Sequence, residues 1–135
     1  MRIRGRVISK GFAEGEVIVS RRKFSFLGDV DVESGVVVAD DSDIRGETIS
    51  NKIFVFPGGR GSTVGTYILL RMKKKGTAPK AIINVETEPI IAVGAIIAEI
   101  PLMDKFEVNP LEVFESCDYA IVNAYEGYVE VKRRV

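Results

Sequence analysis

The stretch KIFVFPGGRGSTVGTYILLRMKKKG, residues 52–76, joins an apolar run to a helix-like pattern through a glycine-rich turn. The run IFVF at 53–56 is typical of a buried strand. After the turn we predict a helix over 62–75, closed by Gly76, and then a second strand in KAIINV at 80–85. Strand, helix and strand in this order indicate a βαβ unit and therefore a parallel sheet.

The rest of the chain adds a β-rich unit before this stretch and a hairpin after it. Short β-branched or aromatic runs predict strands in RIRGRVIS (2–9), EVIVS (16–20), FSFL (24–27) and GVVVAD (35–40), with turns in GFAEG (11–15) and GDVDVESG (28–35). An apolar helix is expected to begin near Pro89. The tail predicts two strands, CDYAIVN (117–123) and GYVEVKR (127–133), joined by a turn around Glu126 and Gly127. We therefore expect one α/β domain over 1–135, an N-terminal β-rich unit plus a βαβ layer.

Charge and hydropathy exclude several classes of function. The 19 Lys and Arg residues balance 19 Asp and Glu residues and are mostly dispersed, whereas nucleic-acid binders concentrate positive charge on one face. The longest apolar stretch, PIIAVGAIIA at 89–98, is about half of a membrane span. Charges interrupt the N-terminal segment, which argues against a signal peptide. We expect a soluble, cytoplasmic protein that binds neither nucleic acid nor membrane.

The inventory of side chains also limits the chemistry. The sequence has no histidine, which excludes imidazole catalysis, a Ser-His-Asp triad and the commonest zinc sites. It has a single cysteine, Cys117, which can form no internal disulfide and cannot supply the ligands of an iron–sulfur cluster. We interpret Cys117 as a small buried apolar residue near the start of a strand.

The glycine-rich turn is the first candidate site. A helix N-terminus presents unpaired N–H groups and partial positive charge, and Gly58, Gly59 and Gly61 would let backbone approach an anion closely. Arg60 in this position calls for an anion or an acidic neighbour. A purely structural turn, with Ser62 or Thr63 as helix cap and Pro57 ending the strand, is the alternative. The turn matches neither a P-loop nor a Rossmann fingerprint.

The second candidate is INVETEP, at the end of the following strand. Glu86, Thr87 and Glu88 are expected beside the loop of Arg60, because ligands of parallel sheets bind outside the carboxyl ends of the strands. Arg60 and the two carboxylates could then share one cleft. The alternative is that Thr87 or Glu88 caps the helix that begins near Pro89. The acidic stretch DDSDIRGE at 40–47 lacks the ligand spacing of a calcium loop, and we interpret it as a solvated turn.

Several segments, in this order, resemble the small subunit of the aconitase X family over nearly the whole chain. They are GFAEG (11–15), FSFLGDVDVESG (24–35), SDIRGE (42–47), FPGGRGST (56–63) and ETEPIIAVGAIIAEIP (86–101). The sequences SDIRGE and GRGST are similar to the archaeal two-chain branch rather than to bacterial relatives. The resemblance implies a swivelling β/β/α domain that closes over a large catalytic subunit, whose own cysteines hold a 4Fe–4S cluster.

The resemblance further implies a hydro-lyase that is active only with its large subunit and in which Ser62 takes the proton from carbon. Substrate-binding positions carried over in this way are Arg60, Gly61, Thr63, Gly59 and Glu88. The implied substrate is a small phosphorylated hydroxy acid, 5-phosphomevalonate. A hydroxy-proline substrate, such as cis-3-hydroxy-L-proline, and a non-catalytic, anion-binding scaffold subunit remain open as alternatives.

Overall fold

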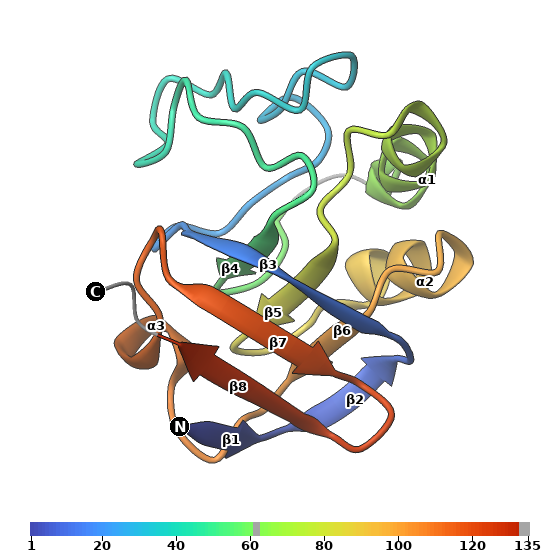
Figure 1. Ribbon diagram of the computed structural model, residues 1–135. Coiled ribbons are helices and arrows are strands. Elements are labelled where there is room, and N and C mark those ends of the chain that lie inside the picture. The colour runs from blue at the N-terminus through green and yellow to red at the C-terminus, as the bar shows by residue number, and fades with distance from the viewer. Residues whose placement is uncertain (61–62, 133–135) are drawn as a thin grey trace.

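The computed structural model describes residues 1–60 and 63–132, which form eight strands in one mixed sheet and three helices (Figure 1). The strands are β1 (Arg2–Arg4), β2 (Arg6–Ser9), β3 (Phe12–Val19), β4 (Ile53–Phe56), β5 (Ala81–Asn84), β6 (Leu102–Asp104), β7 (Tyr119–Asn123) and β8 (Tyr128–Lys132). The helices are α1 (Gly65–Lys75), α2 (Pro89–Ile97) and α3 (Pro110–Val113). The order across the sheet is β1-β8-β7-β3-β4-β5-β6-β2.

Strand β3 divides the sheet into two layers because its two halves pair differently. Residues 12–16 pair antiparallel with β7, whereas residues 17–19 pair parallel with β4. The antiparallel layer continues to β8 and β1, and the parallel layer continues to β5 and β6. Helices α1 and α2 lie side by side and cover the parallel layer (Figure 1). The result is the expected three-layer β/β/α architecture.

Gly5 brings the two edges of the sheet together. The predicted strand over 2–9 is in fact two strands, β1 and β2, which part at Gly5 and pair with opposite ends of the sheet, on β8 and β6. The Gly5 N–H donates to the Gly127 carbonyl oxygen at 3.2 Å. A Cβ at this position would lie 2.6 Å from the ring of Phe106 and 2.9 Å from the Asp104 carbonyl oxygen. Only glycine therefore fits where the sheet closes on itself.

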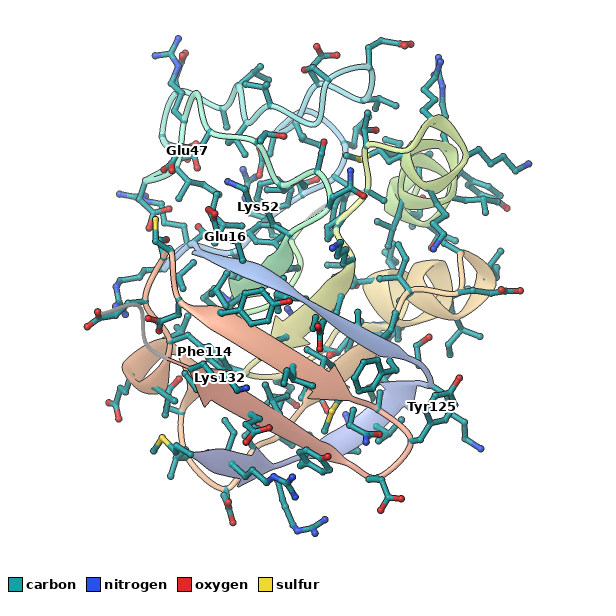
Figure 2. All side chains as sticks on the ribbon, in the orientation of Figure 1. Glu16, Glu47, Lys52, Phe114, Tyr125 and Lys132 are labelled. Atoms are coloured by element: carbon teal, nitrogen blue, oxygen red, sulfur yellow. The ribbon has the colours of Figure 1, made fainter. Side chains whose placement is uncertain are left out.

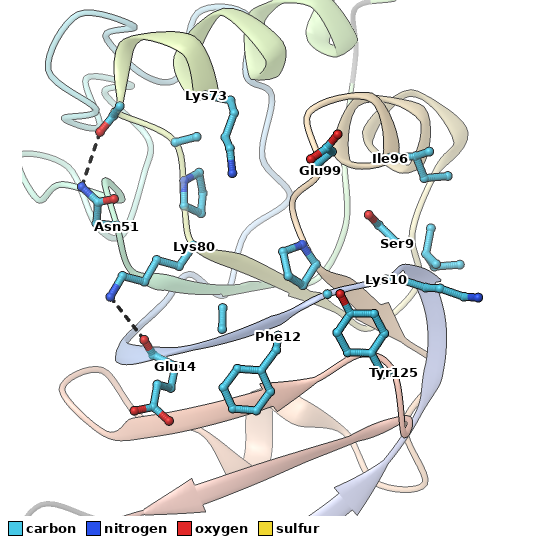
Figure 3. Close-up of a pocket in the computed structure, with 17 residues that line it drawn as sticks. Ser9, Lys10, Phe12, Glu14, Asn51, Lys73, Lys80, Ile96, Glu99 and Tyr125 are labelled. Atoms are coloured by element: carbon cyan, nitrogen blue, oxygen red, sulfur yellow. Dashed lines mark hydrogen bonds between the residues drawn. The ribbon is translucent and has the colours of Figure 1, made fainter.

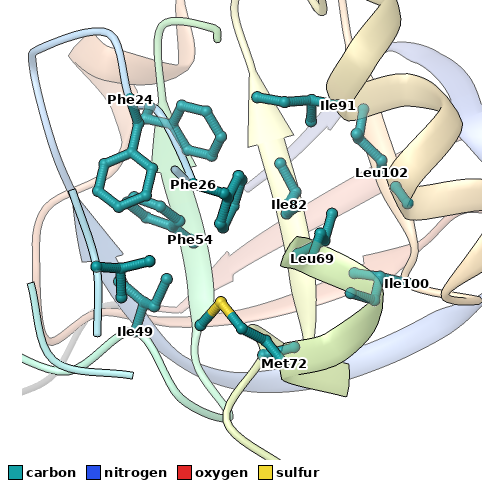
Figure 4. Packing of buried hydrophobic residues seen from close by; sticks show 14 of the residues in the cluster. Phe24, Phe26, Ile49, Phe54, Leu69, Met72, Ile82, Ile91, Ile100 and Leu102 are labelled. Carbon is teal, nitrogen blue, oxygen red and sulfur yellow. The ribbon is translucent and has the colours of Figure 1, made fainter. Parts of the chain in front are cut away.

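The layers enclose two hydrophobic cores, and β4 contributes to both. Ile53 and Val55 face the core between the two sheet layers, while Phe54 and Phe56 face the core under the helices. All four are fully buried, as expected for a parallel strand covered on both faces. In the helix-side core, Phe24, Phe26 and Phe54 pack near Leu69 and Met72 of α1 (Figure 4).

The long connection between β3 and β4 differs from the prediction. The expected strands at 24–27 and 35–40 form no ladder in the structure and make only isolated bridges, Phe24 with Gly59, Val30 with Val37 and Val36 with Thr48. Their apolar side chains instead anchor an irregular loop on the helix-side core, so the alternating pattern reflects burial and not strand pairing. Lys52, at the end of this connection, pairs with Glu16 of β3 at 3.5 Å (Figure 2).

In the segment GFAEG, predicted as a turn, the last four residues form the beginning of β3, and Gly11 precedes the strand. Exposed Phe12 and Glu14 alternate there with half-buried Ala13 and buried Gly15, which is the period of a strand despite the two glycines. The predicted βαβ unit and the hairpin of β7 and β8 are confirmed, as is the start of α2 at Pro89. Strand β6 and helix α3 were not predicted.

Helix α1 begins at Gly65, and Val64 occupies the N-cap position that we expected Ser62 or Thr63 to take. Thr63 is an exposed turn residue, and Gly61 and Ser62 lie outside the described residues. The helix closes at Gly76 with a φ of 81°, as predicted. Within the described part of the chain, no helix is long and apolar enough to cross a membrane.

Candidate functional site

Three loops meet at the carboxyl edge of the parallel layer. They follow β3 (residues 20–24), β4 (residues 57–60) and β5 (residues 85–88). Backbone hydrogen bonds join the first two, because Phe24 N–H donates to the Gly58 oxygen at 3.0 Å and Arg60 N–H donates to the Phe24 oxygen at 3.2 Å. This is the edge at which ligands of parallel sheets bind, as the sequence predicted for Arg60 and Glu88.

Arg60 pairs with an acidic residue that sequence reasoning did not connect to it. Its Nη2 atom lies 2.8 Å from Oδ1 and 2.9 Å from Oδ2 of Asp29, whose side chain is only 10% exposed. The Ser25 N–H also donates to Oδ2 of Asp29, at 2.8 Å. The acidic neighbour that we expected for the charge of Arg60 therefore comes from the long connection between β3 and β4. It stands 31 positions away, in a segment we had interpreted only as a turn.

Gly58 and Gly59 make room for the neighbouring loop. A Cβ on Gly58 would lie 2.6 Å from the carbonyl oxygen of Glu86, and one on Gly59 would lie 2.7 Å from Oε1 of Glu88. The first contact is with backbone, which cannot move away cheaply. These contacts give both glycines a packing role between loops, and the close approach of a ligand to them stays a prediction.

Glu88 caps helix α2. Its carboxylate accepts hydrogen bonds from the N–H groups of Ile91, at 2.7 Å, and Ile90, at 3.1 Å. This is the capping alternative that the sequence left open. Glu86 is exposed, and the Thr87 hydroxyl donates to Oδ1 of Asn84 at 3.2 Å.

At this edge of the sheet, Arg60 and Glu86 line different cavities. A cleft of about 610 Å³ runs along Gly58, Gly59 and residues 85–89. Arg60 lines a different cavity of about 260 Å³, together with Ser20, Arg22, Lys23, Phe24, Asp29, Asp41 and Ser42. Arg60 and Glu88 both line a void of about 10 Å³. Lys23 lines both of the larger cavities and therefore lies between them.

A second arginine–aspartate pair, Arg6 with Asp104, holds the loop after β5 through Thr87. Nε and Nη2 of Arg6 donate to Oδ1 and Oδ2 of Asp104, each at 2.9 Å, and Thr87 N–H donates to Oδ2 at 2.8 Å. Burial raises the pKa of the Asp104 carboxyl, but the hydrogen bonds from Arg6 and Thr87 outweigh burial and leave this pKa below its ordinary value. The carboxylate of Asp104 is fully buried and stays ionised.

Another hollow of the described surface lies at the opposite edge of the sheet. It is a groove of about 1090 Å³ near the C-terminal ends of α1 and α2, and its wall includes Phe12, Tyr125, Lys73, Lys80 and Glu99 (Figure 3). Of the predicted site residues that the structure describes, Gly59, Arg60, Thr63 and Glu88, none lines it.

Cys117 is exposed and not buried as we predicted, and its backbone φ of 76° places it in the left-handed region at a tight turn. Among the described residues, no group of three or more Cys, Asp or Glu side chains could hold a metal ion. Nothing in this part of the chain offers the thiolates that an iron–sulfur cluster requires.

Comparisons with known proteins agree along almost the entire chain. The family model described as the aconitase X swivel domain matches residues 2–131. The phosphomevalonate dehydratase small subunit of Methanosarcina acetivorans is 52% identical over 131 residues, which cover 97% of this chain and 91% of that one. The protein of the same name from Thermococcus kodakarensis is 55% identical over 131 residues, covering 97% and 96% of the two chains.

A solved structure gives the same result for the fold. One chain in the crystal structure of Thermococcus kodakaraensis aconitase X in its holo-form superimposes with a TM-score of 0.92 at 49% identity. The superposition covers 97% of this chain and 98% of that chain.

Proposed function

Since the chain belongs to the family of aconitase X swivel domains, we propose that it is the small subunit of a phosphomevalonate dehydratase. The complex would remove water from (R)-5-phosphomevalonate and form trans-anhydromevalonate 5-phosphate, a step of an archaeal mevalonate pathway. The observation that carries this proposal is the identity of about half of all residues, over nearly the full length of both chains, with small subunits of that name from several archaea.

The composition of the chain supports a division of labour with a large subunit. A cluster of the 4Fe–4S type is held by several cysteine thiolates, and this chain has one cysteine. We therefore assign the cluster to the large partner subunit, where its iron would act as a Lewis acid toward the departing hydroxyl group. This chain would contribute the groups that bind the anionic substrate and take the proton, and it would have no activity alone.

We assign the role of base to Ser62, which lies outside the described residues. Its place in the sequence supports the assignment, because it follows Arg60 and precedes α1, which begins at Gly65. The positive end of this 11-residue helix and the arginine both favour negative charge nearby, which a serine alkoxide needs. Backbone N–H groups of Gly61 and Thr63 would add to that stabilisation.

Arg60 would bind the anionic part of the substrate from the same loop. Gly59 and Glu88 would then support the site indirectly, since the first gives space to the loop after β5 and the second fixes the start of α2. In this arrangement, the residues that touch substrate are carried by a loop that other loops hold in place.

Anaerobic reconstitution with the large subunit tests the proposal. The purified complex is assayed for reversible dehydration of 5-phosphomevalonate, with Ser62→Ala and Thr63→Ala compared side by side. Removing a preorganised group of this kind lowers kcat by about 10² to 10³, so Ser62→Ala should retain only residual turnover and Thr63→Ala much more. Near wild-type turnover of Ser62→Ala with normal cluster content would contradict the role of Ser62.

The same preparation also separates the alternatives. Turnover of cis-3-hydroxy-L-proline in place of 5-phosphomevalonate would indicate the other substrate class. Absence of turnover with both substrates, in a complex that carries its cluster, would indicate a scaffold subunit and contradict the proposed function.

A further inference from the structure

We infer that Asp29 is a positioning residue, which fixes the guanidinium of Arg60 so that its free edge stays available for the anionic group of a ligand. The inference rests on the proposed function insofar as that ligand is the substrate. It is carried by the geometry of the pair, by the rigid surroundings of Asp29 and by the cavity that Arg60 lines.

The pair is formed end-on. One nitrogen, Nη2 of Arg60, contacts both carboxylate oxygens of Asp29, at 2.8 and 2.9 Å. The N–H groups of Nε and Nη1 have no hydrogen-bond partner within residues 1–60 and 63–132. A guanidinium whose strongest acceptor occupies only one nitrogen can still grip a carboxylate or phosphate through its other donors.

Asp29 is itself held rigidly, which makes it a suitable anchor. Its side chain accepts from Ser25 N–H at 2.8 Å, and its carbonyl oxygen accepts from the N–H groups of Val38, at 2.8 Å, and Ala39, at 3.3 Å. A flexible arginine loses much rotamer freedom when it binds an anion. Because Asp29 has already restricted Arg60, less of this entropy is lost on binding, which is the usual benefit of preorganisation.

The cavity beside the pair provides space and compensating charge. Asp29 neutralises part of the charge of Arg60, and the carboxylate of Asp41 adds to this effect. Arg22 and Lys23 line the same cavity of about 260 Å³ and restore positive charge there. The ligand chemistry that fits is a carboxylate or phosphate group, both of which the proposed substrate carries.

Two variants of Asp29 separate positioning from support of the loop. In Asp29→Asn, an amide oxygen at the place of Oδ2 can still accept from Ser25 N–H, while the amide nitrogen replaces Oδ1, cannot accept from Nη2 of Arg60, and the charge is lost. Asp29→Ala removes both contacts. Asp31→Asn is the matched control, since Asp31 is exposed, bonds only to Glu33 and Ser34 through its side chain in the described structure, and loses the same charge.

The first measurement is the NMR signal of the Arg60 Nε–H group in the full-length chain. In the wild type and in Asp31→Asn we expect a signal that is displaced from that of a freely rotating arginine and that shifts further when inorganic phosphate is added. In Asp29→Asn the signal should collapse toward that of a freely rotating arginine, and phosphate should bind about tenfold more weakly. An Arg60 signal that is equally averaged in wild type and Asp29→Asn would overturn the inference.

The second measurement is kinetic and uses the complex with the large subunit. Asp29→Asn should raise KM for 5-phosphomevalonate about tenfold with a smaller change in kcat. In an Arg60→Met background it should change nothing further, because Asp29 acts through Arg60. An unchanged KM, or an equal loss in both backgrounds, would overturn the inference.

A wild-type complex that does not dehydrate 5-phosphomevalonate would instead contradict the proposed function. The NMR measurement would still decide the role of Asp29.

Discussion

Two arginine–aspartate pairs with a buried or nearly buried carboxylate match in composition and exposure but differ in geometry. The side chains of Arg6 and Arg60 are 47% and 46% exposed, and those of Asp104 and Asp29 are 0% and 10% exposed. Arg6 places two nitrogens on two oxygens, whereas Arg60 places one nitrogen on both. The first pair joins neighbouring positions of β2 and β6, and the second joins two loops.

This difference separates a structural pair from a pair that can serve a ligand. A bidentate fork uses both donors that point toward the carboxylate and gives the strongest and most directional pairing. Asp104 also accepts from Thr87 N–H, so removal of its carboxylate leaves a backbone donor without its partner. An end-on contact fixes the guanidinium and leaves the remaining donors for another anion.

The largest expected effect is on the free energy of unfolding when the Arg6–Asp104 pair is broken. Asp104→Ala should lower the free energy of unfolding of the full-length chain by about 3 kcal/mol, because it removes a buried charged acceptor from Arg6 and Thr87. Asp29→Ala should cost clearly less. Urea denaturation followed by circular dichroism measures both values. Equal losses would mean that the two pairs have the same structural role.

Lysine substitutions test the geometry of the two pairs directly, since lysine keeps the charge but cannot form a fork. Arg6→Lys should lower the melting temperature and leave the activity of the complex nearly unchanged. Arg60→Lys should do the reverse, with little change in melting temperature and a fall in kcat/KM of about tenfold or more. The same ranking of the two variants in both assays would contradict this contrast.

The pH dependence of the free energy of unfolding should reveal the contribution of the Arg6–Asp104 pair. Burial raises the pKa of Asp104, but Arg6 and Thr87 lower it to below the ordinary value of 3.8. The folded protein therefore binds this proton less readily than the unfolded chain, and the ionised carboxylate stabilises the fold above pH 3.8. That contribution is lost as the pH falls through the folded pKa.

We therefore expect the stability difference between wild type and Asp104→Asn to be constant from neutrality to about pH 5 and to shrink below that. Urea midpoints measured as a function of pH provide the test. A difference that stays constant down to pH 3 would show that the charge of Asp104 contributes nothing to the stability of the fold. Glu86→Gln, at an exposed position, provides the control.

The smallest expected effect concerns Glu88, which lies next to Thr87 and beside the loop of Arg60. Glu88→Ala removes the acceptor for two N–H groups of α2 and should cost about 1 kcal/mol of stability. Glu88→Asp, which keeps a good capping group, should cost less. A large loss of stability in Glu88→Asp would show that packing beside Gly59 matters more than the cap.

Local patterns predicted the parallel core and the edge of the sheet at which the loops of the candidate site meet. The run at 53–56, the glycine turn and the strand at 80–85 are contiguous, so their periodicity reports their structure. The pairing of Arg60 with Asp29 depends on how an irregular loop folds back over β4, and no local signal encodes that. The prediction of strands at 24–27 and 35–40 was also wrong because of tertiary packing. Apolar residues that alternate because a loop buries them against the core have the same sequence pattern as a strand.

The closure of the sheet at Gly5 has a consequence for synthesis of the chain. The partners of the first two strands are β8, which ends at Lys132, and β6, which ends at Asp104. During synthesis, β2 therefore cannot pair before β6 has been made, and β1 cannot pair before β8 has been made. The first strand of the sheet therefore pairs with the last one, and the sheet can close only after β8 has been made.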